Sequence, residues 1–185
     1  MSAIVIQLPL RESDIAGLKA GDAVLLSGPM LSGRDAAHKR LVAALNEGKP
    51  LPVDLKGETI YYAGPCPTPP GKVIGSAGPT TSGRMDSYTP TLLELGLKGM
   101  IGKGQRSPLV IEAMKKQTAL YFAALGGAGA LIARSIKSAE VIAYPELGPE
   151  AIHRLVVENF PVIVAVDAQG NDLYQLGRAQ YVKSN

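Results

Sequence analysis

Three cations in glycine-containing turns are the side chains with the clearest capacity for chemistry. They are Arg34 in SGRDAAH, Arg84 in GPTTSGRMD and Lys103 in GKGQR. Guanidinium and ammonium groups bind carboxylates and phosphates, and a guanidinium can hold a carboxylate through two parallel hydrogen bonds. If these cations converge, each pair repels by about 4 kcal/mol at ~4 Å in a partly screened site. Convergence would therefore imply an anionic ligand with one or two carboxylates.

The loop around Arg84 adds hydroxyl groups to this set. Thr80, Thr81 and Ser82 precede the arginine, and hydrophobic residues are nearly absent between Ser76 and Pro90. Glycines let the backbone approach a ligand closely, and free N–H groups near a helix start attract anions. The alternative is a surface turn in which the threonines satisfy only local backbone groups. No P-loop pattern occurs, which disfavours a nucleotide phosphate.

Two further titratable residues lie close to these cations in the sequence. His38 follows Arg34 by one helical turn, and Asp86 follows Arg84 by two residues. Either side chain could support proton transfer. The lone Cys66 is weaker, because an isolated thiol is more often a small hydrophobe than a nucleophile.

Each cation is expected at a junction between a strand and a helix. Apolar runs predict a strand at 23–30, ending in a Gly-Pro turn before Arg34, and one at 100–102 before Lys103. A short strand at 73–78 is expected to lead into the loop that holds Arg84. In open α/β sheets, ligands bind beyond the carboxyl ends of the strands.

Helices are expected after these strands from apolar spacing and from start and stop signals. The first covers RDAAHKRLVAALNEG, with Ser32 or Asp35 as its cap and Gly48 as its stop. Asp35 would otherwise only balance the helix dipole. The second helix is expected to be capped by Thr89 and the third by Ser107, and a short helix is expected in GGAGALIARSI.

The remaining pattern indicates the fold class. Strands are expected at 4–8, 59–64, 119–125 and in AEVIAYP. The C-terminal part is predicted to contain the strands LVVE, PVIVAVD and NDLYQLG, with a turn at AQGN. Strands that alternate with short helices indicate an α/β or mixed three-layer class. The length suits a single domain over residues 1–185.

Composition argues against several classes of partner. The net charge is only +3, the Lys and Arg residues are scattered, and aromatic residues make up 5%, so no nucleic acid is expected. The longest apolar stretch, Ala119–Ala133, contains three glycines and is too short to span a membrane. No signal-peptide pattern begins the sequence, so a cytoplasmic location is expected.

Five blocks of the sequence together resemble a known enzyme family. They are GPMLSGRDAAHKR, YYAGPCPTPPGKVIGSAGPTTSGRMD, GMIGKG, AEVIAYPELGPEAI and PVIVAVDAQGNDLY, in this order over nearly the whole chain. They are similar to the β subunit, or C-terminal domain, of class I fumarases and L-tartrate dehydratases, the iron–sulfur hydro-lyases. The resemblance implies a single swivelling β/β/α domain of three layers with a mixed sheet, which closes over a catalytic cluster.

The resemblance also implies where the cofactor lies. In this family a 4Fe–4S cluster is held by three cysteines of the α subunit or N-terminal domain, and one iron is open to the substrate. Such a cluster needs about three or four thiolates, whereas this chain has the single Cys66. The resemblance thus implies a cluster-bearing α subunit as partner, an α₂β₂ assembly, and no metal ligand in this chain.

Residue roles follow from the same resemblance. Arg34 and Arg84 resemble the arginines that clamp a dicarboxylate substrate, and Lys103 resembles the catalytic lysine beside it. Thr80 and Thr81 resemble the threonines that contact the substrate, with Thr80 similar to a catalytic base. The implied activity is reversible hydration of fumarate to L-malate.

The identity of the base and of the substrate stays open at this point. A threonine hydroxyl is a poor base near neutral pH unless cations stabilise its alkoxide or it relays a proton. His38 and Asp86 are therefore kept as supporting candidates. L-Tartrate dehydratase is the nearest alternative activity, and a non-catalytic module that binds small anions is an alternative from another class.

Overall fold

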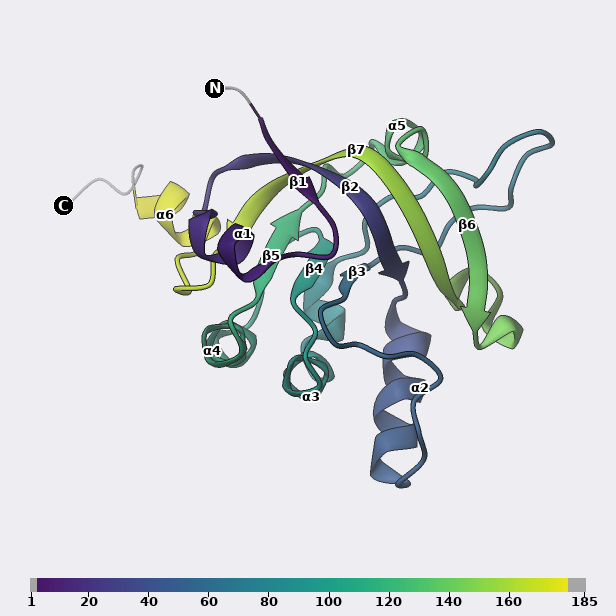
Figure 1. Cartoon of the computed structure of the whole chain (residues 1–185), viewed down its shortest axis with the longest axis horizontal. Coiled ribbons are helices and arrows are strands. Elements are labelled where there is room, and N and C mark those ends of the chain that lie inside the picture. Colours follow the sequence, from purple (N-terminus) through teal and green to yellow (C-terminus); the bar gives the residue numbers. More distant parts are fainter. Residues whose placement is uncertain (1–2, 180–185) are drawn as a thin grey trace.

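The computed structural model describes residues 3–179, which contain a seven-stranded sheet with helices packed against it (Figure 1). The strands are β1 Ile4–Gln7, β2 Ala23–Ser32, β3 Thr59–Tyr61, β4 Gly99–Gly102, β5 Leu120–Ala123, β6 Ile136–Ala143 and β7 Ile152–Val166. The α-helices are α1 Glu12–Gly17, α2 Asp35–Asn46, α3 Thr89–Glu94, α4 Pro108–Gln117, α5 Gly129–Ala133 and α6 Leu173–Ala179. The 3₁₀-helices η1 Ser82–Met85 and η2 Pro145–Glu150 lie in connections.

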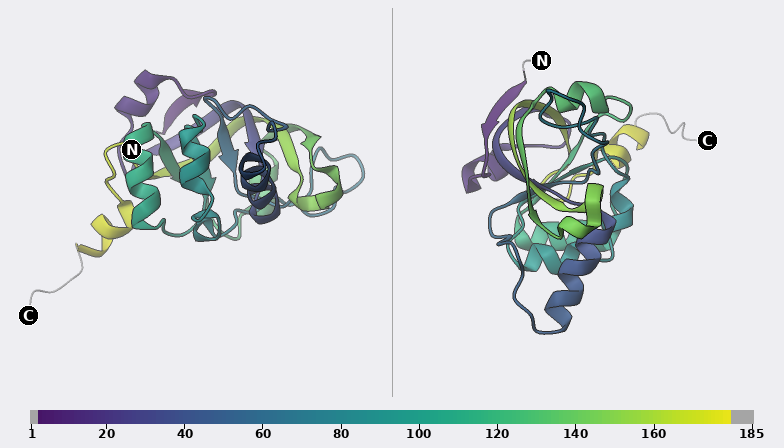
Figure 2. Two further views of the ribbon diagram at one scale, coloured as in Figure 1. Left: turned by 90° about the horizontal axis from the view of Figure 1, so that it is seen from below. Right: turned by 90° about the vertical axis from the view of Figure 1, so that its right-hand side faces the viewer.

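The sheet is mixed and curls back on itself. Its order is β1-β2-β3-β4-β5-β7-β6, and the neighbours from β1 to β5 are parallel. β7 runs antiparallel to β5 and β6, and it also pairs with β2 from Ala23↔Ile163 to Ser32↔His153. Because of this extra pairing, β2, β3, β4, β5 and β7 form a closed ring of strands (Figure 2).

Side chains that alternate along the ring strands divide the buried residues into two cores. Leu120 and Phe122 of β5 belong to a core to which every ring strand contributes, while Tyr121 between them points to the other face. That second core is covered by α2, α3 and α4, which lie together on one side of the sheet (Figure 1). The period-two pattern of the strands is what separates the two cores.

The helices of the second core bury residues at helical spacing. Ala37 and Leu41 of α2 are four residues apart and buried, as are Val110 and Met114 of α4. Their burial holds the helices against the outer face of the ring.

Two predictions about strands near the polar loop are wrong. β2 does not end in a Gly-Pro turn but continues to Ser32, with a bulge between Leu26 and Gly28 in its pairing with β7. The bulge lets the strand pass through this dipeptide without losing its partner. The strand predicted at 73–78 is absent, and that segment is irregular chain whose Ser76 carbonyl accepts the N–H of Cys66.

The predictions for the C-terminal part are wrong in two places. LVVE and PVIVAVD belong to the single 15-residue strand β7. NDLYQLG forms helix α6 rather than a strand, because the Asp172 carboxylate accepts the Tyr174 N–H at 2.9 Å at the helix start. The predicted turn at AQGN is present, with the Gly170 N–H donating to the Asp167 carbonyl at 3.0 Å.

The helix caps follow the sequence signals in part. Ser107 caps α4 as predicted, and its hydroxyl accepts the Val110 N–H at 3.4 Å. Thr89 is the first residue of α3 rather than its cap, and its hydroxyl donates to the Met85 carbonyl at 2.9 Å. Whether a Ser or Thr at a helix start acts as a cap thus depends on which backbone group its hydroxyl can reach.

The mixed α/β class is confirmed. The three layers, the swivelling motion and the single domain over residues 1–185 stay predictions, and the two ends of that range lie outside the described residues. None of the helices within residues 3–179 combines the length and the apolar character that a membrane crossing requires.

Candidate active site

A pocket of about 420 Å³ opens where the parallel strands β2, β3 and β4 end. The residues that were predicted to bind substrate all line it: Arg34, Thr80, Thr81, Arg84 and Lys103. Arg34 follows the end of β2, and Lys103 follows the end of β4 directly. The three cations therefore converge on one hollow at the carboxyl edge of the sheet.

The polar loop is inserted between the ends of β3 and β4. The Thr80 N–H donates to the Tyr62 carbonyl at 2.7 Å, and the Lys103 N–H donates to the Thr80 carbonyl at 3.1 Å. The Ser82 N–H then donates to the Lys103 carbonyl at 2.8 Å, and Thr81 pairs in parallel with Lys103. The loop thus lies like an extra strand, and its backbone has little freedom to move.

Two glycines allow this tight packing. A Cβ at Gly102 would lie 2.9 Å from a ring carbon of Tyr62 and would also overlap the Ser82 hydroxyl. A Cβ at Gly129, which lines the pocket, would lie 2.6 Å from the Ser76 hydroxyl and 2.8 Å from the Gly78 nitrogen. These positions let chain segments approach each other, where the sequence suggested approach to a ligand.

Asp35 joins the two arginines of the pocket. Its Oδ1 lies 2.6 Å from Arg84 Nε and its Oδ2 lies 3.1 Å from Arg34 Nε. Burial alone would raise the pKa of Asp35, but its own backbone N–H and the two guanidinium groups outweigh burial and hold that pKa below its usual value. The expectation that Asp35 only balances the helix dipole was therefore incomplete.

Glu150 at the end of η2 is a second carboxylate that the sequence analysis missed. Its Oε2 accepts the Ala36 N–H at 2.9 Å, so Glu150 caps α2 in place of Ser32 or Asp35. Its Oε1 lies 3.4 Å from Arg34 Nη2. Glu150 is 114 residues from Ala36 along the chain, and no local pattern announces such a contact.

The ion pairs leave part of the cationic capacity unused. Arg34 and Arg84 pair with the two carboxylates Asp35 and Glu150, and Lys103 is the third cation of the pocket. Among residues 3–179, Lys103 has no ion-pair partner, and Arg84 bonds only through Nε and is half exposed. One positive charge and several N–H donors are thus available to an anion in the pocket.

Comparison with known proteins identifies the family. A family model described as Fumarase C-terminus matches residues 1–177. The chain belongs to this family. The aerobic class I fumarate hydratase of Escherichia coli K12 is 47% identical to this chain over 152 residues, which are 81% of this chain and 28% of that protein. Fumarate hydratase 2 of Leishmania major is 44% identical over 83% of this chain and 28% of its own length.

A third relative has the length of this chain. A Methanocaldococcus jannaschii protein named for the β subunit of L(+)-tartrate dehydratase is 37% identical over 95% of this chain and 94% of its own length. The chain thus spans just over a quarter of the named fumarate hydratases but nearly all of this archaeal relative.

His38 does not line this pocket. It is buried, its Nδ1 donates to the Arg34 carbonyl at 2.9 Å, and its ring meets the Tyr62 ring edge to face at 5.2 Å. Burial lowers the pKa of His38 to about 4, against the opposing effect of the Arg34 carbonyl. The ring is therefore neutral near pH 7 and contributes to packing.

Asp86 and Cys66 are not brought into the pocket either. The Asp86 carboxylate lies 2.7 Å from Arg106 Nε and accepts the Ser107 N–H at 2.7 Å. Cys66 is exposed and does not line the pocket. Residues 3–179 contain no group of three His, Cys, Asp or Glu side chains that could hold a metal ion.

His38 should make the stability of the folded chain depend on pH. Its folded pKa of about 4 lies below the ordinary histidine value of 6.5, so the unfolded chain takes up a proton that the folded chain excludes. The resulting stability is complete above pH 6.5 and is lost as pH falls toward 4. Urea unfolding should show a loss from this group of about 2 kcal/mol between about pH 7 and pH 5. His38→Phe should remove that loss, and an equal pH dependence in the two proteins would contradict the assignment.

Asp35→Asn should leave the pocket with one more net positive charge. We expect basal stability to fall by about 1 kcal/mol, since a partly exposed ion-pair network is lost. Malonate is a dicarboxylate that lacks the carbon–carbon double bond of fumarate. It should raise the melting temperature of this variant more than that of the wild type at low salt. Glu112→Gln, which breaks an exposed pair with Lys115 on α4, is the matched control. A malonate effect equal to that of the wild type or smaller would count against the charge balance described above.

Proposed function

We propose that this chain is the β subunit of a two-subunit class I fumarate hydratase, an enzyme that hydrates fumarate reversibly to L-malate. In this proposal, residues 1–185 act as one domain and supply the dicarboxylate-binding half of a shared active site. The observation that carries the proposal is the convergence of Arg34, Arg84 and Lys103 with two threonines in one pocket. Family membership and the hydro-lyase names of the relatives support the reaction class.

The proposal assigns the 4Fe–4S cluster to an α subunit, in an α₂β₂ enzyme of the cytoplasm. The single exposed cysteine of this chain supports that assignment, because such clusters are held by several thiolates. When bound on the partner, the open iron of the cluster would supply Lewis-acid chemistry to the substrate hydroxyl. The remaining steps concern the residues of this chain.

The charge balance of the pocket supports recognition of one carboxylate. Three cations face Asp35 and Glu150, so one positive charge is left for the ligand. Fumarate carries two carboxylates, and we propose that this chain binds one of them while the partner binds the other. Arg84 is suited to this contact, because among residues 3–179 its guanidinium forms a hydrogen bond only through Nε.

The same cations are proposed to act in the chemical step. Removal of the proton next to the bound carboxylate places negative charge on that carboxylate. Arg34, Arg84 and Lys103 would stabilise this developing charge more strongly than the ground state, and the gain in rate comes from that difference. The ion pairs behind the arginines fix two guanidinium groups before substrate binds, so little reorganisation is needed.

Thr80 is the proposed group for proton transfer. Its backbone is held on both sides, through its N–H to Tyr62 and through its carbonyl to Lys103. Its side chain lines the pocket although the residue is largely buried, whereas Thr81 is exposed. We propose that the Thr80 hydroxyl takes or relays the proton with the nearby cations stabilising its alkoxide, and that Thr81 contacts the substrate.

L-Tartrate dehydratase is the second candidate activity. The observation that favours it is length: the archaeal relative named for that β subunit is matched over 94% of its chain. Its substrate also presents two carboxylates, so the cationic pocket would serve in the same way. The pocket residues of this chain do not distinguish the two substrates, so the extra hydroxyl of tartrate would have to be recognised by other groups.

Reconstitution tests the proposal. The chain is produced together with a cluster-bearing α subunit, and hydration of fumarate and dehydration of L-tartrate are assayed under anaerobic conditions. Turnover with fumarate above that with tartrate is expected. Preference for tartrate would establish the second candidate, and activity with neither substrate would favour a non-catalytic anion-binding module.

Arg84→Lys tests the role of the pocket cations in that complex. Lysine keeps the charge but loses both the planar fork and the contact of Nε with Asp35. We expect turnover to fall by roughly tenfold or more, with weaker substrate binding, because a donor aimed at developing charge is lost. Arg40→Lys, in an exposed pair with Glu146 on the outside of α2, is the control. Wild-type turnover in Arg84→Lys would rule out the role.

A further inference from the structure

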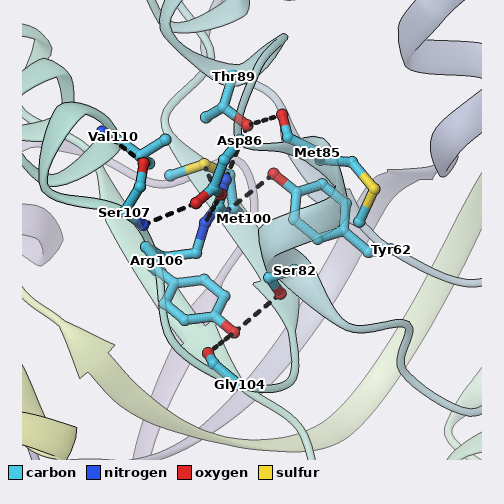
Figure 3. Close-up of polar contacts among 11 residues, drawn as sticks. Tyr62, Ser82, Met85, Asp86, Thr89, Met100, Gly104, Arg106, Ser107 and Val110 are labelled. Atoms are coloured by element: carbon cyan, nitrogen blue, oxygen red, sulfur yellow. Dashed lines mark hydrogen bonds and ion pairs between the residues drawn. The ribbon is translucent and has the colours of Figure 1, made fainter.

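A buried polar cluster joins two of the segments that carry pocket residues, the loop bearing Arg84 and the turn bearing Lys103 (Figure 3). We call it the Arg106 cluster; its members are Tyr62, Ser82, Asp86, Thr89, Arg106 and Tyr121. The Arg106 side chain is 0% exposed, which is rare for an arginine. None of the functions proposed above uses this residue, and the sequence analysis did not single it out.

Every nitrogen of the Arg106 guanidinium has a partner. Nε lies 2.7 Å from the Asp86 carboxylate, and Nη2 donates to the Thr89 hydroxyl at 2.7 Å. Nη1 donates to the Tyr62 hydroxyl at 3.2 Å. The group also packs against the rings of Tyr62 and Tyr121, at 5.4 and 5.1 Å from their centroids.

The cluster also binds the backbone on both sides. Asp86 accepts the Ser107 N–H at 2.7 Å, which ties the end of η1 to the start of α4. The Tyr121 hydroxyl donates to the Gly104 carbonyl at 2.7 Å and lies 2.8 Å from the Ser82 hydroxyl. The cluster therefore connects residues 82–89 with residues 104–107.

Stability alone is a poor reason for a buried ion pair. Desolvation of two charges can exceed their attraction, and apolar replacements of similar volume are often as stable. Burial by itself would lower the pKa of Arg106, but Tyr62 and Asp86 outweigh it and raise that pKa, so the guanidinium stays charged. What the ion pair adds is directional contact among four separate parts of the chain.

Those contacts end next to the pocket. Ser82 lies between Thr81 and Arg84, and Gly104 follows Lys103. We propose that Arg106 is a positioning residue that sets the spacing between the loop bearing Arg84 and the turn bearing Lys103. It acts through Asp86 and Tyr121 and does not touch the ligand. This inference rests on the proposed function, in which that spacing matches one carboxylate of a dicarboxylate.

A double variant separates positioning from stability. Arg106→Met leaves the Asp86 charge buried without its partner and should destabilise the fold strongly. Adding Asp86→Asn removes that charge and keeps an acceptor for the Ser107 N–H, so the melting temperature should largely recover. Malonate affinity by calorimetry, and turnover of the reconstituted enzyme, should stay about tenfold or more below the wild type. A solely structural role predicts that both recover together with stability, which would overturn the proposal.

Two further variants keep the test decisive. Arg106→Lys retains a charge for Asp86 and should fold, yet it cannot bind three partners at once, so its malonate affinity should fall by about tenfold. Wild-type affinity in Arg106→Lys would overturn the proposal. The pair Arg154→Met with Glu58→Gln removes an ion pair that lies outside the pocket and should leave affinity and turnover unchanged. A loss in this control as large as in the Arg106 variants would likewise overturn it.

The readouts also distinguish this inference from the proposed function. If the wild-type complex acts on neither fumarate nor tartrate while malonate affinity still depends on Arg106, the hydro-lyase assignment fails and the positioning role stands. If fumarate is hydrated equally well by the wild type and by the stable double variant, the positioning role fails and the proposed function stands. A wild-type chain that neither binds malonate nor supports turnover overturns both.

Discussion

The pairing of Asp35 with both Arg34 and Arg84 is the interaction on which the pocket depends. Two guanidinium groups and an ammonium group at one edge of a sheet repel one another, by about 4 kcal/mol per pair at ~4 Å. Asp35 and Glu150 offset most of that repulsion. Neither carboxylate lines the pocket, and two carboxylates leave three cations with one net positive charge and with free N–H donors. The protein thus holds its cations together without a ligand while staying ready to bind one.

The strand topology places these groups where such pairing is possible. β2, β3 and β4 are parallel, so the turns that follow them meet at one edge. β7 closes the ring by pairing with both β2 and β5, which stiffens the platform beneath that edge. The loop lies between the ends of β3 and β4 and contacts the Arg106 cluster. Together they fix the positions of the two threonines and of Lys103. The strand topology therefore sets the approximate positions of the pocket residues, and side-chain contacts then refine them.

Local signals allowed the end of β4 at Gly102 and the Ser107 cap to be predicted from the sequence, because each depends on neighbours within a few residues. The contacts that complete the site are not local. Arg84 meets Asp35 across 49 positions and Ala36 meets Glu150 across 114, and nothing in their surroundings marks them as partners. The burial of Arg106 was missed for the same reason. Helix α6 was predicted as a strand because Asn171 and Asp172 were interpreted as hairpin-turn residues, whereas Asp172 caps the helix.

The central claim is that this chain holds one carboxylate of a dicarboxylate between its arginines, in a site completed by another subunit. A crystal structure of the chain in complex with its cluster-bearing partner and malonate tests it most directly. The account predicts one malonate carboxylate within hydrogen-bond distance of Arg34 and Arg84, with Lys103 beside it and Asp35 still pairing both arginines. Malonate bound away from these side chains, or bound with both carboxylates on the partner, would contradict it.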